Sequence, residues 1–276
     1  MLSVGTVFDF MKGKIMAGLR ILCLGDIVGQ QTLLVLRKQL GAIRKKYGVD
    51  MVIANGENVA EGNGIMPDDA DELLYSGVDV ITGGNHSWQK NRIYQYLDDK
   101  SEIIRPANYP AEAPGRGYTI YETAGVRVLV INMLGRVFME PLDCPFEASD
   151  RILEREKGNY DISILDFHAE ATAEKKSLGY YLDGRVSAIF GTHTHVTTAD
   201  EQILPKGSGY ITDVGMCGCE DSALGVDVAT VIEKLKNKLP VRFKQASGTI
   251  TLNGIVFEFD GKFRTVKVER IRERGM

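Results

Sequence analysis

Five short apolar segments of this chain each end in a polar tip that carries an acidic, amide or imidazole side chain. The tips are Gly25-Asp26, Gly56-Glu57-Asn58, Gly84-Asn85-His86, Phe167-His168 and Thr192-His193-Thr194-His195. Short apolar runs bounded by turn residues are typical of buried strands. Because ligands of α/β sheets bind at the carboxyl ends of the strands, the pattern predicts an α/β fold in which these tips can meet at one site.

The segments between the strands have the periodicity of helices and hairpins. Apolar residues three and four apart predict helices in QQTLLVLRKQLGAIRKKYG, MPDDADELLYSG and ATAEKKSLGYYLDG, which are residues 30–48, 66–77 and 171–184. Residues 117–134 predict a β-hairpin around Ala124-Gly125, and residues 248–271 predict hairpin strands with turns at Asn253-Gly254 and Asp260-Gly261. Strand–helix units joined to hairpins favour a two-sheet α/β sandwich. Since no internal repeat or long linker is present, residues 19–276 are expected to form a single domain.

Residues 1–18 are interpreted as an N-terminal extension outside this core, or as the result of an upstream start with Met16 as the working initiator. Lys12 and Lys14 follow the apolar part of this segment and Asp9 interrupts it, whereas a secretory signal places its basic residues first. Four cysteines in a chain without a secretory signal predict reduced thiols and a cytoplasmic location.

The overall charge excludes some classes of partner. With 33 basic and 37 acidic residues the chain is slightly negative, so neither stable nucleic-acid binding nor attraction to an anionic membrane is expected. No apolar stretch approaches the ~20 residues needed to cross a bilayer.

The distribution of histidine favours a metal site. All four histidines of the chain lie at the strand tips. Any one of them could be an ordinary hydrogen-bonded histidine, Asp26 could be a turn former or helix cap, and Asn85 could be a turn residue with positive φ. Together the tips offer the candidate ligands Asp26, Glu57, Asn58, Asn85, His168, His193 and His195. This mixture favours manganese, iron or zinc over magnesium or calcium, and seven ligands suit two metals that share a bridging carboxylate.

The spacing of the last two histidines permits a common target. On an extended strand, residues i and i+2 point the same way. His193 and His195 are therefore expected to face the metals together, with Thr194 pointing away.

These motifs resemble those of the calcineurin-like metallophosphoesterases, whose usual signature runs D-x-H, G-D-x-x-D, G-N-H-E/D, H and G-H-x-H. This chain lacks the histidine of the first motif, has Glu57-Asn58 at the bridging position, and has Thr192 where the last motif usually begins with glycine. These departures resemble the bacterial YmdB-like phosphodiesterase branch, as do LCLGDIVG, ANGENVAEGNGI, TGGNHSWQK and DFHAEATAEKKSLGYYLDGRVSAIFGTHTHVTTAD. The resemblance runs from about Arg20 to the C-terminus.

The resemblance implies a four-layer α/β/β/α sandwich with a dinuclear site at the strand ends. It implies hydrolysis of 2′,3′-cyclic nucleotides and small artificial phosphoesters with iron or manganese, zinc being possible, in a homo-oligomer. One metal would be held by Asp26, Glu57, Asn58 and His195, and the other by Glu57, Asn85, His168 and His193. The hypothesis for the mechanism is attack on phosphorus by a metal-bridging hydroxide, with His86 as the general acid.

Several alternatives stay open. His86 could orient the phosphate without transferring a proton, and Trp88 could stack on a base or anchor its loop. The same metals could serve a phosphomonoesterase or protein phosphatase. A regulatory protein with residual phosphoesterase activity is the other alternative, although it would be expected to have lost ligands that are all present here.

Overall fold

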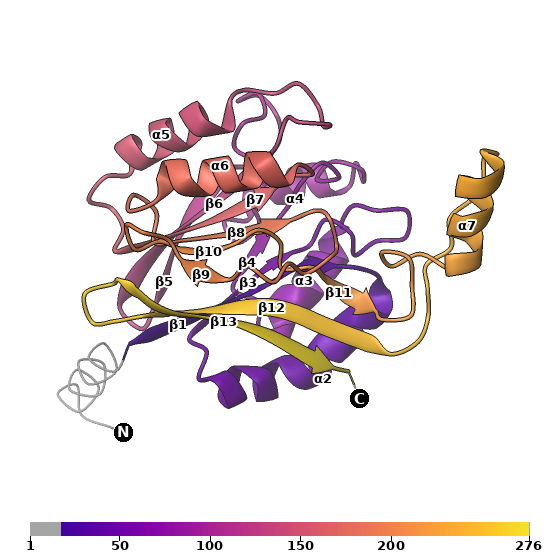
Figure 1. Ribbon diagram of the computed structural model, residues 1–276, viewed down its shortest axis with the longest axis horizontal. Coiled ribbons are helices and arrows are strands. Elements are labelled where there is room, and N and C mark those ends of the chain that lie inside the picture. Colours follow the sequence, from indigo (N-terminus) through magenta and orange to yellow (C-terminus); the bar gives the residue numbers. More distant parts are fainter. Residues whose placement is uncertain (1–17, 276) are drawn as a thin grey trace.

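The computed structural model of the protein describes residues 18–275, and the extension expected at residues 1–18 lies outside them except for Gly18. The described chain forms a mixed α/β fold with two β-sheets, as the strand–helix pattern predicts (Figure 1). No helix within residues 18–275 has the length and apolar character that a membrane crossing requires.

The first sheet has seven strands and contains both ends of the described chain. Its order is β2 (Asp26–Ile27), β11 (Met216–Cys219), β12 (Ile250–Phe259), β1 (Leu19–Leu24), β3 (Met51–Asn55) and β4 (Val80–Thr82), with β13 (Thr265–Arg274) also paired to β12. Strands β1, β3 and β4 are parallel, so their carboxyl ends lie at one edge, whereas β12 runs antiparallel to β1.

The second sheet has six strands, in the order β5 (Tyr118–Thr123), β6 (Val126–Leu134), β7 (Ile162–His168), β8 (Ala188–Thr192), β10 (Gly209–Ile211) and β9 (Gln202–Ile203). The four strands from β6 to β10 are parallel. The carboxyl ends of β7 and β8 lie side by side, because His168 is in register with Thr192.

Helices flank the two sheets on opposite sides. The helices of the described residues are α2 (Gln30–Tyr47), α3 (Pro67–Ser76), α4 (Ile93–Asp99), α5 (Pro145–Arg155), α6 (Thr172–Leu182) and α7 (Val228–Asn237). Figure 1 shows α5 and α6 on one outer side, α2 and α3 on the other, and α7 standing away from the body.

Three apolar clusters hold these elements together. One packs α2 and α3 against the first sheet, one lies between the two sheets, and one packs α5 and α6 against the second sheet. The central strands of both sheets therefore bury side chains on both faces, which explains why their sequences are continuous apolar runs rather than alternating ones.

Most of the expected elements are confirmed. The three predicted helices are α2, α3 and α6, and α2 and α3 are each followed by a glycine in the left-handed conformation, Gly48 and Gly77. Strands β5 and β6 form the hairpin expected around Ala124-Gly125, and β12 and β13 form the one expected around Asp260-Gly261.

The turn expected at Asn253-Gly254 is wrong. Strand β12 runs straight through these residues, with Gly254 paired to Leu24 on one side and Ile271 on the other. A β-carbon on Gly254 would lie 2.8 Å from the carbonyl oxygen of Cys23. The glycine therefore serves a close approach of two strands rather than a turn.

Candidate metal centre

The five polar tips meet between the two sheets, at the carboxyl ends of their strands. Asp26 follows β1, Glu57 and Asn58 follow β3, and the Gly84-Asn85-His86 turn follows β4. From the second sheet, His168 ends β7, and His193 and His195 follow β8. The structure thus brings all eight candidate site residues together from segments that are far apart in the sequence.

The first half of the cluster is centred on the Nε2 atom of His168. This atom lies 3.0 Å from Glu57 Oε1, 3.0 Å from Asn85 Oδ1 and 3.0 Å from His193 Nδ1. An imidazole nitrogen carries one proton or one lone pair and cannot satisfy three such atoms. A cation can, and the nitrogen and oxygen atoms of Glu57, His168 and His193 lie within 4.8 Å of one another. The donor set therefore fits a transition metal.

The second half of the cluster contains Asp26, Asn58 and His195. The Nε2 atom of His195 lies 3.6 Å from Asp26 Oδ1 and 3.3 Å from the Asn58 amide, and that amide lies 3.4 Å from Asp26 Oδ1. Glu57 Oε1 lies 3.5 Å from the same amide. Glu57 consequently borders both halves, which is the position that a bridging ligand requires.

His86 lies against the bridging position. Its backbone N–H donates to Glu57 Oε2 at 2.8 Å, and its Nδ1 lies 3.1 Å from Glu57 Oε1 and 3.2 Å from Asn58 Oδ1. Its Nε2 lies 3.2 Å from Asn63 Nδ2. The side chain is 28% exposed, whereas that of Glu57 is 1% exposed. His86 is thus a member of the cluster that a substrate can reach.

The cluster holds its carboxylates ionised despite complete burial. Burial opposes the charge of Glu57, but His168 and His86 lower the pKa of Glu57 far below its ordinary value. Burial likewise opposes the charge of Asp26, and His195 and His168 lower its pKa. Burial disfavours charge on His168, yet Glu57 and Asp26 raise its pKa to about 9. Burial and the charge of His168 lower the pKa of His193 to about 4.

The extended geometry expected for His193 and His195 is wrong. Strand β8 ends at Thr192, and both histidines have positive φ, 97° and 63° respectively. Left-handed backbone is rare for residues with a β-carbon and costs free energy. Both rings nevertheless face the cluster, His193 through Nδ1 and His195 through Nε2. Thr194 bonds away from it, to the carbonyl of Val196.

A buried polar network lies behind His168, and the sequence motifs do not predict it. The Nδ1 of His168 lies 2.9 Å from Thr192 Oγ1, which donates to Asp166 Oδ1 at 2.7 Å. Asn55 and Thr82 also bond to Asp166, whose pKa burial raises to about 6. Asp166 and Asn55 stand two residues before His168 and Glu57, so the period of a strand could have indicated them.

A buried ion pair supports the His193 loop. Lys175 of α6 donates to Asp213 Oδ2 at 2.6 Å and to the carbonyl of Thr192 at 2.7 Å. Asp213 also accepts from the backbone N–H of Thr194 at 3.2 Å.

The turn after β4 requires a glycine at position 84. A β-carbon on Gly84 would lie 2.4 Å from Glu57 and 2.5 Å from His168, so only glycine lets these candidate ligands meet. Helix α6 and the Gly84 turn therefore both shape the cluster.

Trp88 packs in the way expected of a loop anchor. Its indole N–H donates to the carbonyl of Pro114 at 3.2 Å, and its ring makes an edge contact with Tyr109, with centroids 4.5 Å apart.

The fold and the site define a protein of the metallophosphoesterase type. The model of the YmdB-like protein family matches residues 22–271, and the chain belongs to this family. It is 46% identical over 254 residues to a 2′,3′-cyclic-nucleotide 2′-phosphodiesterase of Bacillus subtilis, covering 92% of this chain and 96% of that protein. The family membership expected from the motifs is confirmed.

Two solved structures share the fold. A Thermus thermophilus protein, described as hypothetical, has a TM-score of 0.88 and 40% identity, covering 94% of this chain and all of that one. A Mycoplasma pneumoniae protein, described as a novel phosphatase, has a TM-score of 0.88 and 33% identity, covering 94% of each chain.

Proposed function

We propose that this protein is a phosphodiesterase that hydrolyses 2′,3′-cyclic nucleotides at a dinuclear metal site. The observation that carries the proposal is the convergence of seven ligand-type side chains and His86 on one buried position. The activity of the Bacillus subtilis relative supports the choice of substrate.

The residues would divide between two metals that share Glu57. Asp26, Glu57, Asn58 and His195 would hold one, and Glu57, Asn85, His168 and His193 would hold the other. Iron or manganese suits this mixture best, and zinc is a further candidate. When bound, such metals supply Lewis acidity and an activated water for attack at phosphorus.

The protein's own residues would then handle the leaving oxygen. Glu57 holds the His86 ring through Nδ1, which leaves Nε2 to deliver a proton to the departing ribose oxygen. Imidazole suits this role because its ordinary pKa is near neutrality. The carbonyl of Leu224, 3.1 Å from Nδ1 of His195, directs the other nitrogen of that ring to the cluster.

A comparison of substrates distinguishes the proposed phosphodiesterase from a phosphatase. The phosphatase is an alternative because the Mycoplasma pneumoniae relative is described as one. Turnover of 2′,3′-cyclic AMP, a nucleoside monophosphate and a phosphopeptide is measured with the manganese-loaded protein. We expect kcat/KM to be largest for the cyclic nucleotide. A larger value for the monophosphate or the phosphopeptide would show that the protein is a phosphatase instead.

The remaining expectations extend this proposal. The three apolar clusters support a four-layer α/β/β/α order, and the family match over residues 22–271 supports a single domain. All four cysteines are free thiols, which is consistent with a cytoplasmic location. A homo-oligomer stays a prediction.

A further inference from the structure

A pocket of about 170 Å³ opens directly beside the metal cluster. Asn58 and His195 form part of its lining. The loop after β3 contributes Asn63, and Phe243 and Gln245, which follow α7, line it as well. Asn63 is the residue that contacts Nε2 of His86, 3.2 Å away. The pocket therefore adjoins the side of the site where a leaving group would accept its proton.

The wall of this pocket is fixed to the cluster. The carbonyl of Leu224 lies 3.1 Å from His195 Nδ1, and the next residues pair with the segment after α7. Val226 forms an antiparallel bridge with Gln245, and the N–H of Ala246 donates to Gly225 at 2.9 Å. A ligand in the pocket would thus lie against a segment that is hydrogen-bonded to His195, a candidate metal ligand.

Phe243 provides an aromatic ring that the core does not use. Phe243 is 47% exposed, and Lys234 Nζ lies 4.1 Å from the ring centroid. Lys234 lies outside the pocket lining, and Lys244 is the lysine that belongs to it. Aromatic rings beside cations are typical of sites that stack nucleobases, and stacking accepts any base because every base has a π-face.

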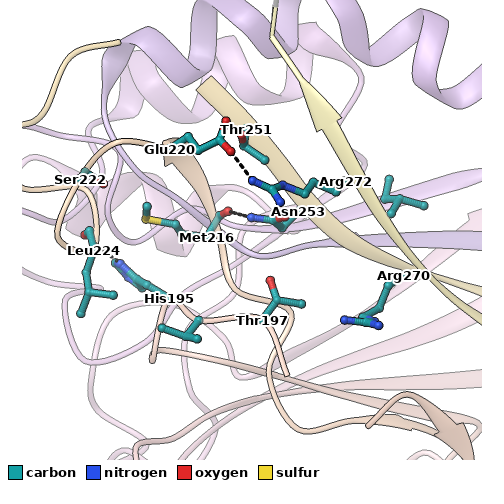
Figure 2. Close-up of a pocket in the computed structure, with 13 residues that line it drawn as sticks. His195, Thr197, Met216, Glu220, Ser222, Leu224, Thr251, Asn253, Arg270 and Arg272 are labelled. Atoms are coloured by element: carbon teal, nitrogen blue, oxygen red, sulfur yellow. Dashed lines mark hydrogen bonds and ion pairs between the residues drawn. The ribbon is translucent and has the colours of Figure 1, made fainter. Parts of the chain in front are cut away.

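The larger pocket next to His195 fits a base less well. It has a volume of about 580 Å³, and residues of β13, among them Arg270 and Arg272, form part of its lining (Figure 2). Its arginines are already paired, Arg270 with Glu201 at 2.8 Å and Arg272 with Glu220. Of the described residues that line it, none is Phe, Tyr or Trp.

We propose that the pocket at Phe243 is the subsite for the nucleobase, and that Phe243 stacks on it. This inference rests on the proposed phosphodiesterase function and identifies the part of the substrate that gives specificity. Phe243 would favour cyclic phosphates that carry a base over those that do not, with little preference among the bases.

The test compares two substrates with the same five-membered cyclic phosphate. 2′,3′-Cyclic AMP carries a base and glycerol 1,2-cyclic phosphate does not. The variants are Phe243→Ala, Phe243→Trp, which restores a ring, and Tyr75→Ala. Tyr75 is 76% exposed on α3 and does not line the pocket, so it is a matched control. Binding of adenosine 3′-phosphate and of inorganic phosphate is measured in parallel by calorimetry.

Loss of the stack should act on the base alone. We expect Phe243→Ala to raise KM for the cyclic nucleotide and Kd for adenosine 3′-phosphate about tenfold or more. The same variant should leave glycerol 1,2-cyclic phosphate and inorganic phosphate unchanged, Phe243→Trp should restore the affinity, and Tyr75→Ala should have no effect.

The outcomes separate the two proposals. If Phe243→Ala changes none of the four ligands, or weakens the ligands with and without a base equally, the proposed subsite is wrong, and hydrolysis of 2′,3′-cyclic AMP by the wild type still supports the phosphodiesterase. If the wild type hydrolyses neither cyclic phosphate, the proposed function fails, and the calorimetric comparison alone decides whether Phe243 binds a base.

Discussion

At the scale of single residues, His86 is the candidate general acid, and it lies between solvent and Glu57, the candidate bridging ligand. We predict that His86→Ala keeps the metals and lowers the turnover of 2′,3′-cyclic AMP by about 10²–10⁴-fold, the usual contribution of a general acid. Metal content and kcat are the measurements. A p-nitrophenyl phosphodiester provides the control, since its leaving group needs no proton. An equal loss on both substrates would favour the alternative role of orienting the phosphate.

Thr192 is the second residue whose side chain acts on the cluster, through His168. Its hydroxyl lies between His168 Nδ1 and Asp166, so it holds the ring with Nε2 toward the ligands. Removing such a partner usually weakens metal binding by about 10–100-fold. Thr192→Val, which keeps the shape, should show this loss in a metal titration, and Thr192→Ser should not. Equal affinities in the two variants would contradict the role.

At the scale of elements, the Lys175–Asp213 pair joins α6 to the loop that follows β8. Both side chains are almost fully buried, at 2% and 1% exposure. Lys175→Met leaves the charge of Asp213 buried without its partner, which should lower the free energy of unfolding by about 3–5 kcal/mol. Denaturant titration measures this. Lys157→Met, in an exposed pair with Glu154, is the control and should change stability by less than about 0.5 kcal/mol.

The elements also show what local sequence can and cannot predict. The strand tips, the helices and two hairpins follow from periodicity and turn residues, which act over a few positions. The dipeptide Asn253-Gly254 has the same local signal as a turn, but the neighbouring strands β1 and β13 decide its conformation. The left-handed backbone of His193 and His195 likewise depends on contacts from distant segments, such as that of Asp213 with Thr194. Long-range packing, rather than local preference, fixes these features.

At the scale of the whole molecule, we predict that the charge of the cluster changes when metal binds. Burial alone would lower the pKa of His168, but Glu57 and Asp26 raise it to about 9, so the metal-free protein keeps a proton there at neutral pH. A metal needs the neutral ring. We therefore predict that manganese binding at pH 7 releases protons from His168 and from His195, whose pKa Asp26 raises against the effect of burial, and that the apparent affinity rises with pH up to about 9.

Calorimetry in two buffers of different ionisation enthalpy measures this release. A manganese affinity that does not change between about pH 6.5 and 9, without proton release, would contradict this prediction.

The raised pKa of His168 also affects the stability of the metal-free protein. Because the folded pKa lies above the ordinary 6.5, the stabilisation is fully present below about pH 6.5 and is lost as the pH rises through about 9.

The whole molecule brings two sheets together so that candidate ligands from five segments lie around Glu57, the proposed bridging ligand. Metal content of the purified protein, measured together with hydrolysis of 2′,3′-cyclic AMP, tests this most directly. We predict two iron or manganese ions per chain at full activity, and loss of activity when a chelator removes them. Full activity with fewer than two metals per chain would contradict the dinuclear site.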